Sequence, residues 1–149
     1  TLAFAEYIPS HSILLQPTSP FRIPGSIDEA FSNLIDHNFD SLLSVEPSHL
    51  SLWENGPSTA KANYDFEDRA MRQEVMDRQF RENGSIYAFS TELLRDKNNR
   101  LGGRIGLHIS TGIESLEIDT MFDLWMCRKV LEDNLWEHAL PALDKGVEK

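Results

Sequence analysis

Two carboxylates two residues apart, Glu117 and Asp119, are the strongest chemical signal in the sequence. In an extended segment, residues two apart point to the same side, so these side chains would lie together just before a helix. Hard oxygen ligands of this kind suit Mg²⁺, which often takes one or two protein carboxylates together with substrate phosphates. The alternative is that Asp119 and Asp123 only cap the helix and favour its dipole, and the spacing alone favours this alternative.

Arginines cluster once, between residues 69 and 81, in a chain that is otherwise acidic. Guanidinium groups bind carboxylates and phosphates through two parallel hydrogen bonds, so the cluster indicates a pocket for a small anionic ligand. The alternative is a solvated charged face, balanced by the acidic residues between the arginines. The clustered residues are Arg69, Arg72, Arg78 and Arg81.

A polar turn with the sequence QPTSPFR, residues 16–22, follows a short apolar run. Open α/β sheets bind ligands outside the carboxyl ends of their strands, and this turn would lie at such an end. Its amide, hydroxyl and guanidinium groups could line a sugar site, although the same pattern is typical of a tight turn. The candidate residues are Gln16, Thr18, Ser19 and Arg22.

Composition limits the class of protein. The 149 residues suit one domain, and 40% hydrophobic with 26% charged residues is ordinary globular composition. The formal net charge of −10 would repel nucleic acid and anionic membranes, and no apolar run approaches the ~20 residues of a membrane-spanning helix. The single cysteine, Cys127, excludes an intrachain disulfide and fits a reducing compartment, so a cytoplasmic protein is expected. Its position predicts a buried apolar residue rather than a nucleophile.

The elements that must position these residues begin with a strand, a helix and a strand. Residues 12–16 and 41–45 are apolar runs typical of buried strands. Between them, residues 26–37 repeat apolar side chains at the helical period, and Ser26 with Glu29 predicts a capping box. This order predicts a βαβ unit whose two strands form a parallel pair.

Residues 54–82 lack apolar periodicity, which indicates either a solvated loop or an arm that reaches a partner subunit. Strands are predicted again at residues 85–90 and 104–109, followed by a short extended segment at 115–119. Thr120 and Asp123 predict a second capping box, at the start of an amphipathic helix. The apolar residues of that helix are Phe122, Trp125, Met126, Val130 and Leu131. Together the elements predict an α/β layered domain with a mixed sheet.

Taken in order, several stretches resemble the acylneuraminate cytidylyltransferases, the CMP-sialic acid synthetases and their bacterial relatives. The stretches are ILLQPTSPFR at residues 13–22, RQ at 72–73, ENGSIY at 82–87, RLGGRIG at 100–106 and IDT at 118–120. The resemblance covers residues 13–131. It implies a Rossmann-like nucleotidyltransferase, a three-layer sandwich with a mixed sheet, which uses CTP and Mg²⁺ and forms a homodimer. The anomeric hydroxyl of a nonulosonic (sialic-type) acid attacks the α-phosphate of CTP, and CMP-sugar and pyrophosphate are the products.

The resemblance assigns roles residue by residue. It implies that Glu117 and Asp119 hold Mg²⁺, and that Asp119 and Arg72 act in catalysis. It also implies that a cation at the sugar-acid site pairs with the substrate carboxylate, and that residues 46–80 form a dimerisation arm. The substrate-binding residues it implies are Gln16, Thr18, Ser19, Arg22, Arg72, Gln73, Arg81, Asn83 and Tyr87.

The sequence departs from the family pattern in three places. Glu117 stands where many members have Asp, and residues 73–80 lack the usual Asp-Leu-Pro type sequence, which bears on the match at Arg81. The family's N-terminal region, which grips the CTP triphosphate, has no counterpart here. Residues 1–149 are therefore expected to be the C-terminal part of one cytidylyltransferase domain and to be inactive alone. The alternatives are a non-catalytic remnant that dimerises or binds a sugar acid, and a 3-deoxy-octulosonate cytidylyltransferase.

Overall fold

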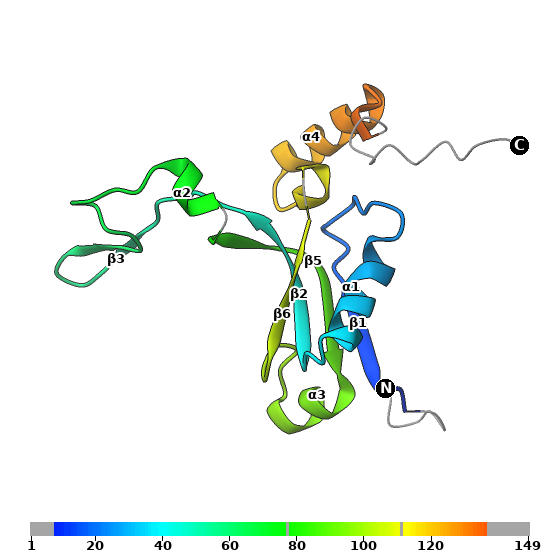
Figure 1. The fold of residues 1–149 in the computed structure, drawn as a ribbon. Helices are drawn as coiled ribbons and strands as arrows, with labels where there is room; N and C mark the ends of the chain where they lie inside the picture. Colours follow the sequence, from blue (N-terminus) through cyan, green and yellow to red (C-terminus); the bar gives the residue numbers. More distant parts are fainter. Residues whose placement is uncertain (1–7, 77, 111, 137–149) are drawn as a thin grey trace, which may run out of the picture.

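The core of the molecule is a mixed four-stranded sheet (Figure 1). The computed structural model describes residues 8–76, 78–110 and 112–136. The strand order is β1-β5-β2-β6, in which β5 is antiparallel to both neighbours and β2 is parallel to β6. The prediction of an α/β fold with a mixed sheet is confirmed. The strands are β1 (His11–Leu15), β2 (Ser41–Pro47), β5 (Phe80–Ser90) and β6 (Ile105–Ile109).

The predicted pairing of the first two strands is wrong. Helix α1 (Ser26–Asp36) does connect β1 to β2, and these strands run in the same direction, but β5 lies between them and pairs with both. The reason is that β5 is apolar on both sides: Ile86 and Ala88 face one side, and Tyr87 and Phe89 face the other. A strand that is buried on both faces is stable only inside the sheet.

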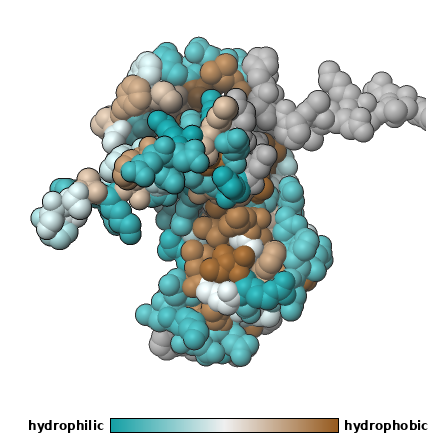
Figure 2. Space-filling view, turned by 60° about the vertical axis from the view of Figure 1, so that its left-hand side comes forward, coloured by the Kyte–Doolittle hydropathy of each residue, from teal (hydrophilic) through white to brown (hydrophobic). Residues whose placement is uncertain are grey.

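Helices lie on both faces of this sheet. On one face, α1 packs Ala30 and Leu34 against β2 and β5. On the other, α3 (Thr91–Lys97) packs Leu93 against Leu43 and Phe89. The second face is only partly covered, and Figure 2 shows hydrophobic side chains gathered on the sheet below the arm. The exposed apolar side chains of β6 are Ile105, Leu107 and Ile109.

The capping box predicted at Ser26 is wrong. The N-cap of α1 is Gly25, with φ of 92°, and no side chain caps the helix there. Ser26 is instead the first helical residue, and its hydroxyl lies 3.1 Å from Nε2 of buried His108 in β6. A tertiary hydrogen bond has replaced the local one.

Residues 48–79 leave the sheet as an arm (Figure 1). The arm contains the hairpin β3 (Trp53–Asn55) and β4 (Ala60–Ala62), then the short helix α2 (Arg72–Met76). Trp53 stacks on Phe66 at 5.7 Å between ring centroids and meets Tyr64 edge-on. Trp53 and Phe66 are nevertheless more than half exposed, so this cluster covers little of its own apolar surface.

The last described segment is a 3₁₀ turn, η2 (Gly112–Ser115), an irregular stretch, and helix α4 (Met121–Glu132). The capping box of Thr120 and Asp123 is confirmed. The segment predicted to be extended, residues 115–119, begins with the last residue of the 3₁₀ turn and is part of no strand. Helix α4 buries Cys127, as predicted, together with Val130. Three of the apolar residues predicted for this helix are instead more than half exposed: Phe122, Trp125 and Leu131. Among the described residues, no helix has the length and apolar character needed to cross a membrane.

Candidate functional site

The carboxyl ends of the three strands that run in one direction meet at one edge of the sheet. Gln16 directly follows β1, Glu46 lies near the end of β2, and the segment carrying Glu117 follows β6. The amino end of β5, with Arg81 and Gly84, arrives at the same edge because β5 runs the opposite way. The topology therefore gathers here residues that are distant in sequence (Figure 1).

Gln16 and Glu117 converge on Gly84. The backbone N–H of Ile118 donates to the carbonyl of Thr18 at 2.8 Å, which fastens the segment of Glu117 to the turn after β1. Gly84 has φ of +66°, and a Cβ at this position would overlap Oε1 of Gln16 and Oε1 of Glu117. A larger residue here would displace the ends of these two side chains and would also have to adopt a left-handed backbone that favours glycine. We call Gln16, Gly84 and Glu117, with the carboxylates around them, the sheet-edge cluster; those carboxylates are Glu46, Glu82 and Asp119.

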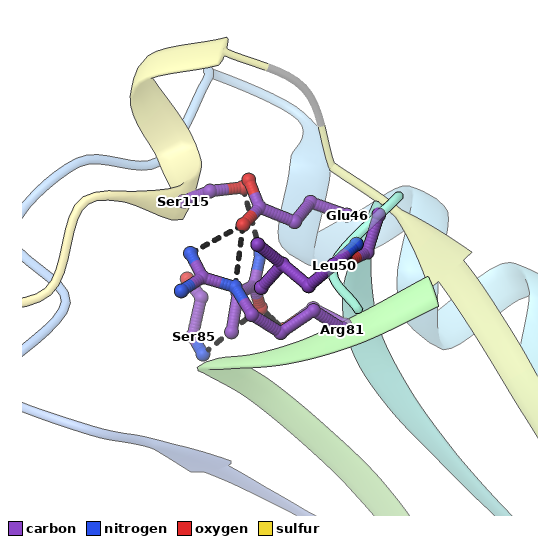
Figure 3. A network of polar contacts seen from close by, with 8 residues as sticks. Glu46, Leu50, Arg81, Ser85 and Ser115 are labelled. Atoms are coloured by element: carbon purple, nitrogen blue, oxygen red, sulfur yellow. Dashed lines mark hydrogen bonds and ion pairs between the residues drawn. The ribbon is translucent and has the colours of Figure 1, made fainter. Parts of the chain in front are cut away.

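The sheet-edge cluster is strongly acidic. Burial raises the pKa of Glu117, Asp119 adds to the increase, and Glu46 and Glu82 raise it further against the lowering effect of Arg81. Arg81 is itself engaged, since its Nε donates to Oε1 of Glu46 at 2.6 Å, and Figure 3 shows its guanidinium directed at that carboxylate. Four carboxylates near one such cation favour the binding of a further positive charge.

The carboxylates of Glu117 and Asp119 meet part of what a Mg²⁺ site needs. The cap of α4 uses Thr120 and Asp123, and Asp119 contributes its backbone N–H to Asp123 at 3.2 Å. The capping alternative is thus correct for Asp123, while the Asp119 carboxylate is not part of the capping box. No group of three or more Asp, Glu, His or Cys side chains in the described residues is arranged to hold a metal ion. Glu117 and Asp119 with substrate oxygens would suit Mg²⁺, which commonly takes few protein ligands.

Arg22 and Asn83 hold the cluster in place. Nη2 of Arg22 donates to the carbonyls of Gln16 and Ser85, each at 2.9 Å, and so ties the turn to β5. Burial lowers the pKa of Arg22, against the raising effect of Glu114. Asn83 is fully buried and accepts from the Ser44 hydroxyl at 2.6 Å. Of the other residues of the turn, Ser19 is buried and Thr18 is half-buried.

Tyr87 lies on the sheet face that packs against α3. It is buried, its hydroxyl donates to Oε1 of Glu82, and the guanidinium of Arg100 lies 4.1 Å above its ring centroid. Burial raises the pKa of Tyr87, and the bond to Glu82 raises it further. Tyr87 is paired with Leu14 of β1, and its hydroxyl group contacts the sheet-edge cluster through Glu82.

Arg72 lies in the arm and lines a separate cavity of about 520 Å³, which we call the arm cavity. None of Gln16, Tyr87 and Glu117 is among the described residues that line it. The cavity and the cluster are neighbours in sequence, since Gln79 in the cavity wall is two residues before Arg81. Gln73 is in α2, but its side chain lies outside the described part of the structure. The charged residues of the cavity wall are Asp65, Asp68, Arg69, Arg72 and Arg78.

Sequence reasoning assigned no role at this site to Glu46, Glu82 or Arg100. Glu46 meets Arg81 only through the antiparallel register of β2 and β5, which no local pattern shows. Arg100 lies in a loop, and its sequence neighbours carry no periodic signal.

A comparison with models of known protein families gives no match to this chain.

Proposed function

We propose that this chain carries the sugar-acid and metal part of an acylneuraminate cytidylyltransferase site. The reaction is transfer of CMP from CTP to the anomeric hydroxyl of a nonulosonic acid, with release of pyrophosphate. The observation that carries the proposal is the convergence of Gln16 and Glu117 on Gly84. Three of the stretches that resemble this family, at residues 13–22, 82–87 and 118–120, meet at this place, whereas Arg72 lies in the arm.

The fold is compatible with the Rossmann-like sandwich of that family. Three strands run in one direction, helices lie on both faces, and the cluster lies at the carboxyl ends of those strands. Open α/β sheets bind their ligands at this edge. The arrangement supports a nucleotide-sugar site there and not on the sheet faces.

Three residues of the cluster, and Arg22 beside it, have chemical roles in this proposal. Glu117 and Asp119 hold Mg²⁺, which neutralises charge on the phosphates of CTP. The Gln16 amide donates to and accepts from sugar hydroxyls, and Arg22 fixes its backbone by two hydrogen bonds to the turn and to β5. Positioning and charge neutralisation supply most of the rate in such phosphoryl chemistry.

The arm supports a homodimer in this proposal. Its aromatic cluster is too exposed to be explained by packing within one chain. Large aromatic side chains dominate the cores of protein interfaces. The proposed interface residues are Leu52, Trp53, Tyr64 and Phe66.

The test is synthesis of CMP-sugar by the protein at its natural length. Given CTP, Mg²⁺ and neuraminic, legionaminic or pseudaminic acid, it should release CMP-sugar and pyrophosphate in equal amounts with one of the three. Gly84→Ala should abolish synthesis, because the new Cβ displaces Gln16 and Glu117. The matched control is Gly112→Ala, with a similar φ of +59° but nothing within 4 Å of the new Cβ. Absence of product with all three acids, or full activity in Gly84→Ala, would contradict the proposal.

A further inference from the structure

Arg100 is held at the margin of the sheet-edge cluster by the loop that follows α3. Asn98 ends the helix in the left-handed conformation, with φ of 48°, and the Asn99 side chain accepts from the N–H of Leu101 at 3.1 Å. Leu101 then packs into the apolar core beside Tyr87. With its backbone fixed on both sides, Arg100 lays its guanidinium over the Tyr87 ring at 4.1 Å.

The hydrogen-bonding capacity of this guanidinium is poorly used by the protein. A guanidinium has five N–H donors. Nε of Arg100 is buried and has no hydrogen-bond acceptor in the described part of the chain. Its nearest carboxylate oxygen, Oε1 of Glu82, is 3.9 Å from Nη2, beyond hydrogen-bonding distance, and already accepts from Tyr87. Beyond a side-chain bond to Tyr87, the exposed part of this guanidinium has N–H donors left for a partner that the described residues do not include.

The other candidate cations of the site are differently placed. The guanidinium of Arg81 forms an ion pair with Glu46, and Arg72 lines the arm cavity. Arg100 lies beside Glu82, a carboxylate of the cluster that also contains Gln16 and Glu117, and its side chain is 39% exposed, so a ligand can reach it. An anionic group that approaches this acidic cluster needs such a cation to offset the repulsion from Glu82 and its neighbours.

We propose that Arg100 binds the carboxylate of the sugar acid whose hydroxyls contact Gln16. The inference rests on the proposed function, and it moves the pairing cation from the positions of the family resemblance to the loop after α3. The ring of Tyr87 fixes the plane of the guanidinium by cation–π contact, so its N–H edge is ready for a planar oxyanion. The phosphates of CTP are the other source of such an anion.

The test compares a sugar acid with its methyl ester, which keeps the shape and lacks the charge. Calorimetry with the protein at its natural length, Mg²⁺ and an α,β-methylene analogue of CTP measures both affinities for whichever of the three acids the wild type binds. Arg100→Lys keeps the charge but loses the paired donors, and should weaken binding of the acid about tenfold while the ester is unaffected. Arg95→Lys, an exposed residue of α3, is the control and should change neither.

A second readout does not depend on activity. The Nε–H resonance of Arg100, assigned by its loss in Arg100→Lys, should shift when the acid is added and not when the ester is added. If Arg100→Lys keeps the wild-type preference for acid over ester, or weakens only the CTP analogue, the carboxylate assignment is overturned while the proposed function stands. If the wild type binds none of the acids, both the proposed function and the role of Arg100 are wrong.

Discussion

The sheet-edge cluster and the arm cavity differ in charge and in construction. The cluster joins the ends of four paired strands and gathers carboxylates around Gln16, Gly84 and Glu117. The arm cavity is built by one contiguous part of the chain, residues 49–79, and carries three arginines. A cation suits the first and an anion suits the second. The residues that the sequence predicts to form one site therefore lie in two structural units, and a site that needs both would have to bridge them.

The largest expected effect is in the cluster. Asp119→Asn keeps size and shape, and the cap of α4 survives because Thr120 and Asp123 form it. Loss of one anionic Mg²⁺ ligand should lower kcat by roughly 10²–10³, as removal of comparable electrostatic groups does elsewhere. Steady-state kinetics of the natural-length protein at limiting Mg²⁺ measures this. Near-normal kcat would remove the metal site from the cluster and leave the arm cavity as the main binding region.

The next effect concerns the arm as an interface. Trp53→Ala should weaken the homodimer by about 30-fold or more, because buried tryptophans at interface centres contribute at least ~2 kcal/mol. Sedimentation across a concentration series measures the dimer dissociation constant. Trp125→Ala is a matched control, since Trp125 on α4 is exposed to the same degree, 53% against 54%. A wild-type monomer at micromolar concentration, or equal effects of both substitutions, would contradict the role of the arm.

The arm cavity should matter less to turnover than the cluster. Arg72→Gln should raise KM for the sugar acid by no more than about twofold and leave Mg²⁺ binding intact, because Arg72 lines a separate cavity and Arg100 is the proposed partner of the substrate carboxylate. Arg128→Gln, an exposed residue of α4, should change neither quantity. Loss of Mg²⁺ binding in Arg72→Gln would mean that the two regions act as one site, and the distinction between them would be lost.

Local patterns predicted the pieces of the cluster well. The turn after β1 and the Thr120 cap both depend on neighbours within a few residues, and the structure has them where the sequence indicated. Each is a short-range consequence of side-chain chemistry.

Long-range pairing is what the sequence could not supply. The insertion of β5 between β1 and β2, and with it the Glu46–Arg81 ion pair, depends on which strands bury both faces. The capping box at Ser26 failed because its hydroxyl meets His108, 82 residues away, and a tertiary contact outweighed a local rule. The division between cluster and arm has the same origin. Arg72 and Arg81 are close in sequence, but Arg72 lies in the arm and Arg81 lies in β5 at the sheet edge.

The smallest effect is on stability and separates the two regions most directly. Ionised Glu117 is opposed by burial and by Asp119, which raise its pKa, so the folded chain holds that proton more tightly than the unfolded chain. The destabilisation is therefore present at neutral pH and fades as pH falls through the pKa of Glu117.

Without Mg²⁺, Glu117→Gln should raise Tm at pH 7 by about 1–2 °C, a small shift because the group is partly exposed and screened. With Mg²⁺ the order should reverse, because the ion stabilises only the chain that binds it. Glu67→Gln, an exposed carboxylate of the arm, should show neither change. Equal stabilisation of wild type and Glu117→Gln by Mg²⁺ in thermal unfolding would show that Glu117 is not a ligand, and that the acidity of the sheet edge serves something other than a metal.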